Sequence, residues 1–121
     1  MGVLLAETWV ENVLEVRRCC DIIMLVRITI GEQVVNLLTV CAPQAGRTMV
    51  KKEGFWIEVG KVVDSCSDGE YLFLCGDMNG HVGMESNGFK GVHGGNSYGA
   101  RNIEGEMLLE FADAKELVVP Y

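Results

Sequence analysis

The chain has 121 residues, the size of one small domain, and 49% of them are hydrophobic, which is enough to build a core. Its 17 acidic and 10 basic residues give a net charge of −7, the wrong sign for electrostatic attraction to a polyanion. Because the basic pairs Arg17-Arg18 and Lys51-Lys52 are isolated, nucleic-acid binding through a basic patch is excluded, and a metal or further protein would have to supply positive potential.

The first third of the chain carries strand patterns separated by turn residues. Apolar or alternating segments predict four strands, at 3–6, 13–17, 22–30 and 34–42. The residues Cys19-Cys20-Asp21 predict a turn before the third of these strands, and Gly31-Glu32 suits a tight hairpin turn after it. Pro43 ends the fourth strand, because proline cannot donate a hydrogen bond to a strand ladder.

The rest of the chain mixes helical patterns with strands. Apolar residues at mostly helical spacing predict a helix over 48–64, and the run 71–75 predicts the next strand. A long loop, 76–105, holds nine of the 15 glycines, and loops of this length are usually functional or disordered. Asn102 suits the N-cap of a second helix, and 117–119 predicts a last strand. The order β-β-β-β-α-β-α-β predicts an α/β layered domain with antiparallel hairpins.

The most informative local feature is the end of the strand at 71–75. Gly76 closes the apolar run, and Asp77 and Asn79 follow it two residues apart. Alternate side chains of an extended backbone share a face, so these two are expected to point into one cleft while Met78 turns back to the core. A carboxylate can hold Mg²⁺ or activate a water, and an amide can hold a phosphate oxygen. The same residue types also favour a simple turn, which composition alone leaves open.

Three motifs in a fixed order carry a family resemblance. They are Cys41-Ala42-Pro43-Gln44, the segment 76–83 (GDMNGHVG) and the segment 99–112 (GARNIEGEMLLEFA). With them the chain resembles the endonuclease/exonuclease/phosphatase superfamily. More narrowly, it is similar to the endonuclease domain of RTE-type retrotransposons and to their domesticated relatives, the craniofacial development protein 2-like proteins. The resemblance covers essentially the whole chain, including 2–7 and 16–18.

The resemblance implies a fold and an activity. The fold is a four-layer α/β sandwich, in which two mixed β-sheets pack face to face and helices flank them. The activity is Mg²⁺-dependent cleavage of a phosphodiester, with Mn²⁺ as a substitute, by in-line attack of an activated water, and the partner is DNA. Asp77 would orient or deprotonate the water and contribute a metal ligand, and Asn79 would hold a phosphate oxygen. The family also suggests residence in the nucleus.

The chain departs from the family pattern in two ways. The family has a tyrosine before its Ala-Pro pair, where this chain has Cys41, and a thiol is a weaker, shorter donor. The family's other metal ligands and its Asp-His pair lie before and after the matched motifs, so 1–121 corresponds to the central part of the domain, without its N- and C-terminal portions. The alternative function is therefore a catalytically inactive, truncated remnant, a pseudoenzyme or a binding module. Such a part leaves sheet edges uncovered, which favours self-association.

Four further residues have two readings each. His81 either approaches the cleft and binds substrate or is an exposed loop histidine, and His93 either touches a phosphate or simply lies among glycines. Arg101 and Asn102 either contact the nucleic-acid backbone or cap the second helix, and both readings can hold together. The glycines at 94, 95 and 99 do not form a phosphate-binding GxGxxG loop.

The cysteines and the hydropathy bear on compartment and metals. The five cysteines and two histidines never fall at zinc-ligand spacing, so a zinc site is not expected. The sequence predicts neither a signal peptide nor a segment long enough to span a bilayer. An intracellular, reduced, soluble protein without a membrane partner is the expectation.

Overall fold

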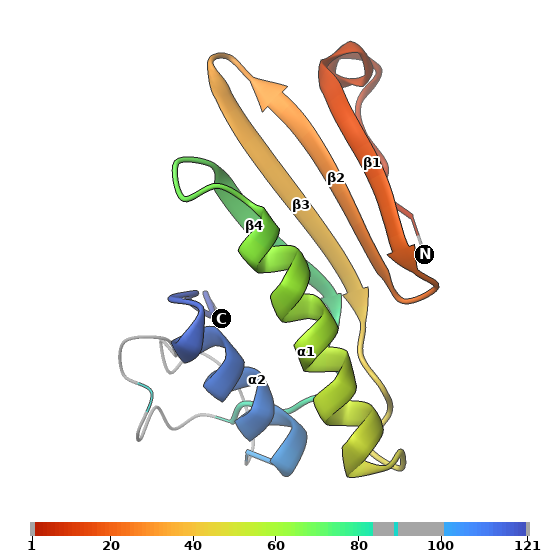
Figure 1. Cartoon of the computed structure of the whole chain (residues 1–121), viewed down its shortest axis with the longest axis vertical. Coiled ribbons are helices and arrows are strands. Elements are labelled where there is room, and N and C mark those ends of the chain that lie inside the picture. The colour runs from red at the N-terminus through yellow and green to blue at the C-terminus, as the bar shows by residue number, and fades with distance from the viewer. Residues whose placement is uncertain (1, 84–88, 90–100, 121) are drawn as a thin grey trace. The chain divides into compact units, whose positions relative to one another are not determined.

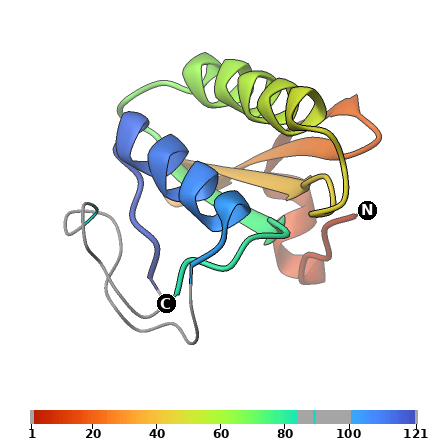
Figure 2. The ribbon, with the colours of Figure 1, turned by 90° about the horizontal axis from the view of Figure 1, so that it is seen from below.

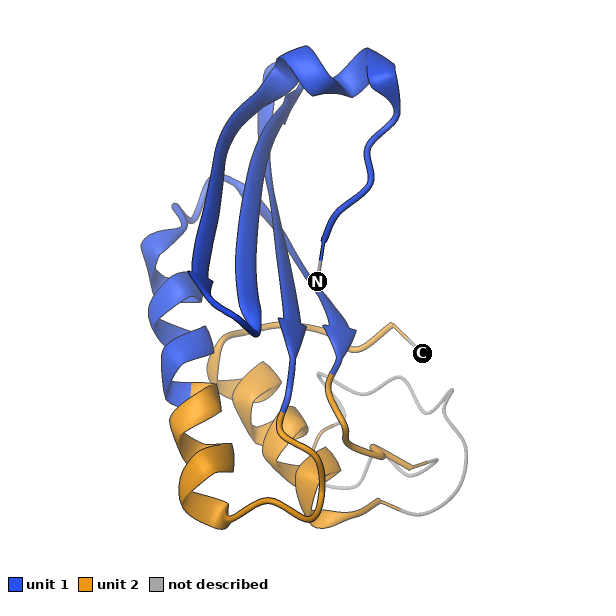
Figure 3. Ribbon diagram, turned by 90° about the vertical axis from the view of Figure 1, so that its right-hand side faces the viewer, with its two compact units in different colours: residues 1–42, 57–77 blue, residues 43–56, 78–121 orange. Residues whose placement is uncertain are grey.

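A computed structural model describes residues 2–83, 89 and 101–120 of the chain (Figure 1). Its elements are η1 (Glu7–Asn12), β1 (Val13–Cys20), β2 (Ile23–Ile30), β3 (Gln33–Cys41), α1 (Met49–Ser65), β4 (Tyr71–Asp77) and α2 (Ile103–Ala114). They fall into two compact units (Figure 3). Unit 1 comprises 1–42 and 57–77, and unit 2 comprises 43–56 and 78–121. The fold is α/β, with one four-stranded mixed sheet and helices, as the α/β prediction required.

The sheet belongs to unit 1 and has the strand order β1-β2-β3-β4. β1, β2 and β3 form an antiparallel meander, and β4 pairs with β3 in parallel after the crossover through α1. The hairpin turn between β2 and β3 is at Gly31, as predicted, and its φ of 62° is a left-handed value that glycine adopts without strain. The β-branched runs of β2 and β3 pair over their whole length, which makes these two strands the centre of the sheet.

One face of the sheet is covered by the second part of α1, residues 57–65 (Figure 2). Ile23, Leu25, Leu38 and Val40 share that face and are almost completely buried. Val59 of α1 is likewise buried, and Arg17 of β1 donates to the Ser65 hydroxyl at the end of the helix, 3.4 Å away. These apolar side chains form the core of unit 1, which the hydrophobic pattern predicted.

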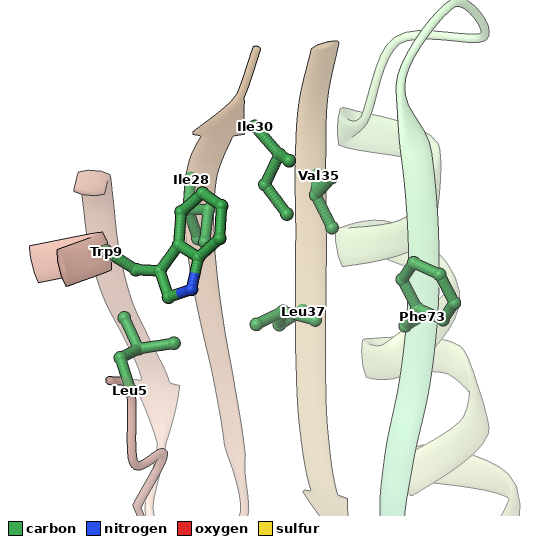
Figure 4. A pocket seen from close by; sticks show the side chains of 7 residues that line it. All are labelled: Leu5, Trp9, Ile28, Ile30, Val35, Leu37 and Phe73. Carbon is green, nitrogen blue, oxygen red and sulfur yellow. The ribbon is translucent and has the colours of Figure 1, made fainter. Parts of the chain in front are cut away.

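The other face of the sheet is only partly covered. Met24, Val26 and Ile28 pack there against the N-terminal segment, including Val3 and Leu5. Beyond them lies an open, apolar hollow of about 350 Å³ (Figure 4), lined by Leu5, Trp9, Ile28, Ile30, Val35, Leu37 and Phe73. The Phe73 side chain on β4 is 56% exposed, so an aromatic ring lies at the margin of this face.

A hydrogen-bonded polar network is embedded in unit 1. Asn36 on β3 is fully buried; its Nδ2 donates to Glu70 Oε1 at 3.0 Å and to the Tyr71 carbonyl at 3.2 Å. Arg27 on β2 donates to Asn36 Oδ1 at 3.1 Å and to Glu70 Oε2 at 2.9 Å. Since every member has a partner, the network ties three strands in register at little desolvation cost. Sequence patterning did not predict it.

Unit 2 is built around α2. Its core consists of Val82, Leu108, Leu109, Ala112 and Val119, with Trp56 among the partly buried residues around them. The Trp56 ring lies 4.7 Å from Phe111 and 4.9 Å from Phe55, centroid to centroid. These contacts make Trp56 a packing residue of unit 2.

Two predictions about the start of the chain are wrong. The segment 3–6 is not a strand but an irregular stretch before the 3₁₀-helix η1, because Val3 and Leu5 pack onto the sheet face instead of the segment joining its edge. Cys19 and Cys20 do not form a turn, because both belong to β1, where Cys20 pairs with Ile23. The turn consists of Asp21 and Ile22, and pairing across the hairpin decides this, not the residue types.

The predicted last strand at 117–119 is also wrong, since only Val119 makes an isolated bridge. The chain leaves α2 through a Schellman turn. The Leu117 N–H donates to the Ala112 carbonyl at 2.8 Å, the Glu116 N–H donates to the Asp113 carbonyl at 3.3 Å, and Glu116 has a φ of 57°. The turn redirects the backbone at Leu117, and Pro120 follows too soon for a ladder to form.

Candidate functional site

The predicted catalytic carboxylate lies at the carboxyl end of two parallel strands in unit 1. Asp77 is the last residue of β4, and the ladder pairs it with Cys41, the last residue of β3. The Ala42 N–H donates to the Asp77 carbonyl at 2.8 Å, which holds the two strand ends together. Both Asp77 and Cys41 are exposed, so a thiol and a carboxylate occupy adjacent positions at the edge where the parallel pair ends.

Gly76 is required where β4 approaches β3. Its φ is 123°, a value that L side chains rarely adopt, and a Cβ at this position would overlap the carbonyl oxygen of Val40. The residue before Asp77 therefore allows a close backbone contact that no other amino acid permits. The glycine of the motif is explained by packing as well as by turn preference.

The expectation that Asp77 and Asn79 share a face relied on an extended backbone through both residues, and this premise is wrong. The strand ends at Asp77, and Asn79 has a left-handed φ of 48°. Asparagine tolerates that conformation better than most residues. Asp77 is the last residue of unit 1, whereas Asn79 lies in unit 2. Met78 packs against the apolar core of unit 2, as predicted.

The loop after Asn79 is seated on the first turn of α2, within unit 2. Asn102 is the N-cap, and its Oδ1 accepts from the N–H groups of Gly105 at 2.8 Å and of His81 at 3.0 Å. The Asn102 N–H donates to the His81 carbonyl at 3.1 Å. Asn102 therefore holds the peptide groups on both sides of His81. The prediction that Asn102 caps the helix is confirmed; its contact with nucleic acid stays a prediction.

Arg101 contributes to the same segment from the opposite direction. Its Nε donates to the Val82 carbonyl at 3.0 Å, its guanidinium pairs with Glu106 at 3.0 Å, and it lies 5.0 Å from the centroid of the Phe89 ring. These contacts direct the guanidinium to groups of the protein. Arg101 therefore has a structural role here, and a contact with substrate stays a prediction.

An ion pair that the sequence did not predict supports the first turn of α2. Lys52 Nζ lies 2.6 Å from Glu104 Oε1 and donates to the Ala45 carbonyl at 2.8 Å. The hydrogen bond from Lys52 lowers the pKa of the Glu104 carboxyl from its ordinary value of 4.5, and the His81 side chain adds a smaller effect in the same direction. The sequence does contain a sign that Lys52 is buried, because Lys52 lies at helical spacing from the buried residues Phe55 and Val59 of α1.

The described residues do not present a set of side chains fit for Mg²⁺. Among residues 2–83, 89 and 101–120, no group of three histidine, cysteine, aspartate or glutamate side chains converges on one point. Asp77 supplies a carboxylate in the segment 76–83, and one carboxylate alone does not fix an octahedral ion. His93 and the glycines at 94, 95 and 99 lie outside the described residues.

Within the part of the chain that the structure covers, neither α1 nor α2 combines the length and hydropathy needed to cross a bilayer. Comparisons with protein-family models, with curated proteins and with solved structures found no match to this chain.

Proposed function

We propose that residues 1–121 form the central part of a domain of the endonuclease/exonuclease/phosphatase type, whose whole is a four-layer α/β sandwich. Two features support this. The three ordered motifs fall at the end of β3, at the end of β4 and at the start of α2. The mixed sheet has one apolar face beneath residues 57–65 of α1 and a second face with an open apolar hollow, which a second sheet would cover.

We propose that the function is hydrolysis of a phosphodiester, with DNA as the substrate. The observation that carries this is the exposed Asp77 carboxylate at the carboxyl end of β4, beside the end of β3. In open α/β sheets, ligands bind outside the carboxyl ends of the strands, and catalytic groups gather there.

In this proposal three residues of the chain act on the phosphodiester: Asp77, Asn79 and His81. Asp77 accepts the proton of a water whose oxygen attacks phosphorus in line with the leaving ester oxygen. The bond from phosphorus to the leaving oxygen breaks as the new P–O bond forms, and the leaving oxygen takes a proton from solvent. Asn79 donates its amide N–H to a phosphate oxygen. His81 follows two residues later and contacts the same DNA strand. Mg²⁺ is what the resemblance implies, but no step is assigned to it, because the described residues lack a fitting ligand set.

The test is conversion of supercoiled plasmid to open circle by the purified full chain. The reaction is run with Mg²⁺ and with EDTA, using the chain and the variants Asp77→Ala and Asp68→Ala. Asp68 is the matched control, because it is an exposed aspartate in the turn before β4, at the opposite end of that strand. Nicking that needs the metal, disappears in Asp77→Ala and persists in Asp68→Ala supports the proposal.

Other outcomes contradict it. Nicking that survives Asp77→Ala would be due to a contaminant or to another site. A folded chain that leaves the plasmid supercoiled would favour the second candidate function, a catalytically inactive remnant that acts as a pseudoenzyme or binding module. The resemblance favours that candidate at one position: Cys41, the register partner of Asp77, stands where the family that the chain resembles has a tyrosine.

We further propose that the chain self-associates through the β4 edge of its sheet. β4 is the last strand in the sheet order, and the chain between Glu70 and Asp77 carries no charge that would guard an edge. The opposite edge strand, β1, is protected by two register irregularities and by Arg17 and Arg18. The β4 edge is therefore the one on which pairing is expected.

A further inference from the structure

The peptide groups around His81 are held by one residue from a distant part of the chain. His81 donates its N–H to Asn102 Oδ1 at 3.0 Å and accepts at its carbonyl from the Asn102 N–H at 3.1 Å. The same Oδ1 accepts from Gly105 at 2.8 Å. One side-chain oxygen thus serves two donors, the loop N–H and a helix N–H that has no partner within its own helix.

Two glycines, Gly80 and Gly105, allow the loop and the first turn of α2 to approach each other closely. A Cβ at Gly105 would overlap the His81 carbonyl oxygen, and a Cβ at Gly80 would lie 2.9 Å from the Glu104 carbonyl carbon and from the Gly105 nitrogen. The loop at Gly80 and the first turn of α2 therefore touch backbone to backbone. This leaves the chain at Gly80 and His81 little freedom to shift along the helix.

The first turn of α2 is itself anchored within unit 2. Glu104 belongs to that turn and pairs with Lys52, whose side chain is 9% exposed and whose Nζ also donates to the Ala45 carbonyl. The turn is thus attached to the start of α1 by a largely buried ion pair, while Asn102 attaches it to the loop at His81. The first turn of α2 thus fixes the position of Gly80 and His81, the residues that follow Asn79.

We propose that Asn102 is a positioning residue for Asn79 and His81, and that its side chain does not touch the substrate. The inference rests on the proposed function, because it concerns the segment that would hold a phosphate oxygen there. Asn79 precedes Gly80 directly and has a left-handed φ of 48°. The Asn102 oxygen seats the loop on α2 together with two further hydrogen bonds, from the Asn102 N–H to the His81 carbonyl and from Arg101 Nε to the Val82 carbonyl. Loss of the oxygen should therefore loosen the backbone that holds Asn79 in this conformation.

A substitution pair separates positioning from substrate contact. Asn102→Ala removes the Oδ1 acceptor to which the N–H groups of His81 and Gly105 both donate. Asn102→Asp keeps an oxygen that accepts both bonds and adds a negative charge, which suits a helix N-terminus. If Asn102 instead touched a phosphate, it would use its amide N–H, and an aspartate would lose that donor and repel the anion.

The experiment measures two quantities on the full chain. The first is the exchange rate of the His81 amide hydrogen, followed by nuclear magnetic resonance. The second is kcat and KM for plasmid nicking. Thr48→Ala is the matched control. The Thr48 hydroxyl accepts a hydrogen bond from the Lys51 N–H at the start of α1, so the substitution weakens a helix cap but removes no hydrogen bond to His81.

We expect the His81 amide to exchange roughly tenfold faster in Asn102→Ala than in the unsubstituted chain, with little change in Asn102→Asp and Thr48→Ala. We expect kcat to fall at least about tenfold in Asn102→Ala with KM little changed, because misplacement of a catalytic group lowers the rate more than it lowers binding. Asn102→Asp should retain most of kcat. The rescue by aspartate is the readout that a substrate contact cannot produce.

Each contrary result has one meaning. Equal loss of nicking in both Asn102 variants, with His81 still protected in Asn102→Asp, would overturn the inference in favour of a substrate contact. Unchanged His81 exchange in Asn102→Ala would overturn it directly. If the unsubstituted chain does not nick DNA, the proposed function fails, and the exchange rates alone then decide whether Asn102 positions the loop.

Discussion

Lys52 Nζ and Glu104 Oε1 lie 2.6 Å apart, and this pair connects the first turns of α1 and α2. Both side chains are largely buried, at 9% and 14% exposure. A buried charge is tolerated only when it is paired, so each of these two residues depends on the other. Through Glu104, the pair also stabilises the first turn of α2, which contacts the loop at His81.

Lys52→Met alone is expected to destabilise the chain more than the double substitution Lys52→Met with Glu104→Gln does. The single substitution leaves a carboxylate largely out of water without its cation, whereas the double one leaves a neutral amide. Thermal unfolding of both, together with Glu104→Gln alone, completes the cycle. Lys61→Met is the control, because the Lys61–Glu58 pair is exposed, and its loss should change the free energy of unfolding by less than about 0.5 kcal/mol. Equal melting temperatures for Lys52→Met and Lys61→Met would contradict the prediction.

Acid should weaken the folded chain below about pH 4.5. Hydrogen bonds from Lys52 and from Asn36 lower the pKa values of Glu104 and Glu70 from the ordinary value of 4.5. The unfolded chain therefore binds protons more readily, so this part of the stability is present above pH 4.5 and is lost as the pH falls through the lowered pKa values. Denaturant unfolding at several pH values should show it. Glu104→Gln should reduce the slope in that range, and an unchanged slope would show that Glu104 titrates alike in both states.

Glu116→Gly should stabilise unit 2 by about 0.5–1 kcal/mol. Glu116 holds a left-handed φ of 57° in the turn that ends α2, which costs a residue with a Cβ roughly 1–2 kcal/mol. Glycine avoids that strain but loses roughly 0.5–1 kcal/mol of additional chain entropy on folding. Chemical denaturation measures the difference. Lys115→Gly, whose φ is −100°, should destabilise instead, and stabilisation by both substitutions would argue against a conformational cause.

Cys41→Tyr tests whether the residue beside Asp77 limits catalysis. The ladder pairs Cys41 with Asp77, and the family resemblance implies a tyrosine hydroxyl there. If the missing hydroxyl is the main defect, its return should raise plasmid nicking about tenfold or more, as a donor aimed at developing charge does. Cys75→Tyr adds the same ring two register pairs earlier, next to Thr39, and should have no such effect. Equal rates in both variants would count against the role of this position.

Phe73→Lys should shift the chain from oligomer towards monomer. Phe73 lies on β4, is 56% exposed and borders the open hollow, and lysine on an edge strand opposes pairing. Sedimentation velocity over a range of concentrations measures the change. Ile57→Lys places the same charge on an apolar residue of α1 that is 60% exposed, and it should leave the association unchanged. An unsubstituted chain that sediments as a monomer at all concentrations would exclude self-association.

Local signals in the sequence predicted the elements whose structure depends on neighbouring residues. Gly31 marks the β2–β3 hairpin because its left-handed φ is a property of one residue, and Asn102 caps α2 because its side chain reaches the helix it precedes. The helix α1 follows from apolar spacing, and β4 follows from the run that ends at Gly76. In these cases the competing structures are disfavoured within a few residues.

Contacts between distant residues decided the rest. Cys19 and Cys20 are strand residues because β1 pairs with β2, and Val3 and Leu5 lie on the sheet because an apolar face is available there. Asn36 and Lys52 are buried because Glu70 and Glu104, 34 and 52 residues away, satisfy their polar groups. The sequence by itself determined the motif at Asp77 and the order of the main elements. Only the tertiary structure decided that Asn102 holds His81, because hydrogen bonds over that distance form when packing brings their partners together.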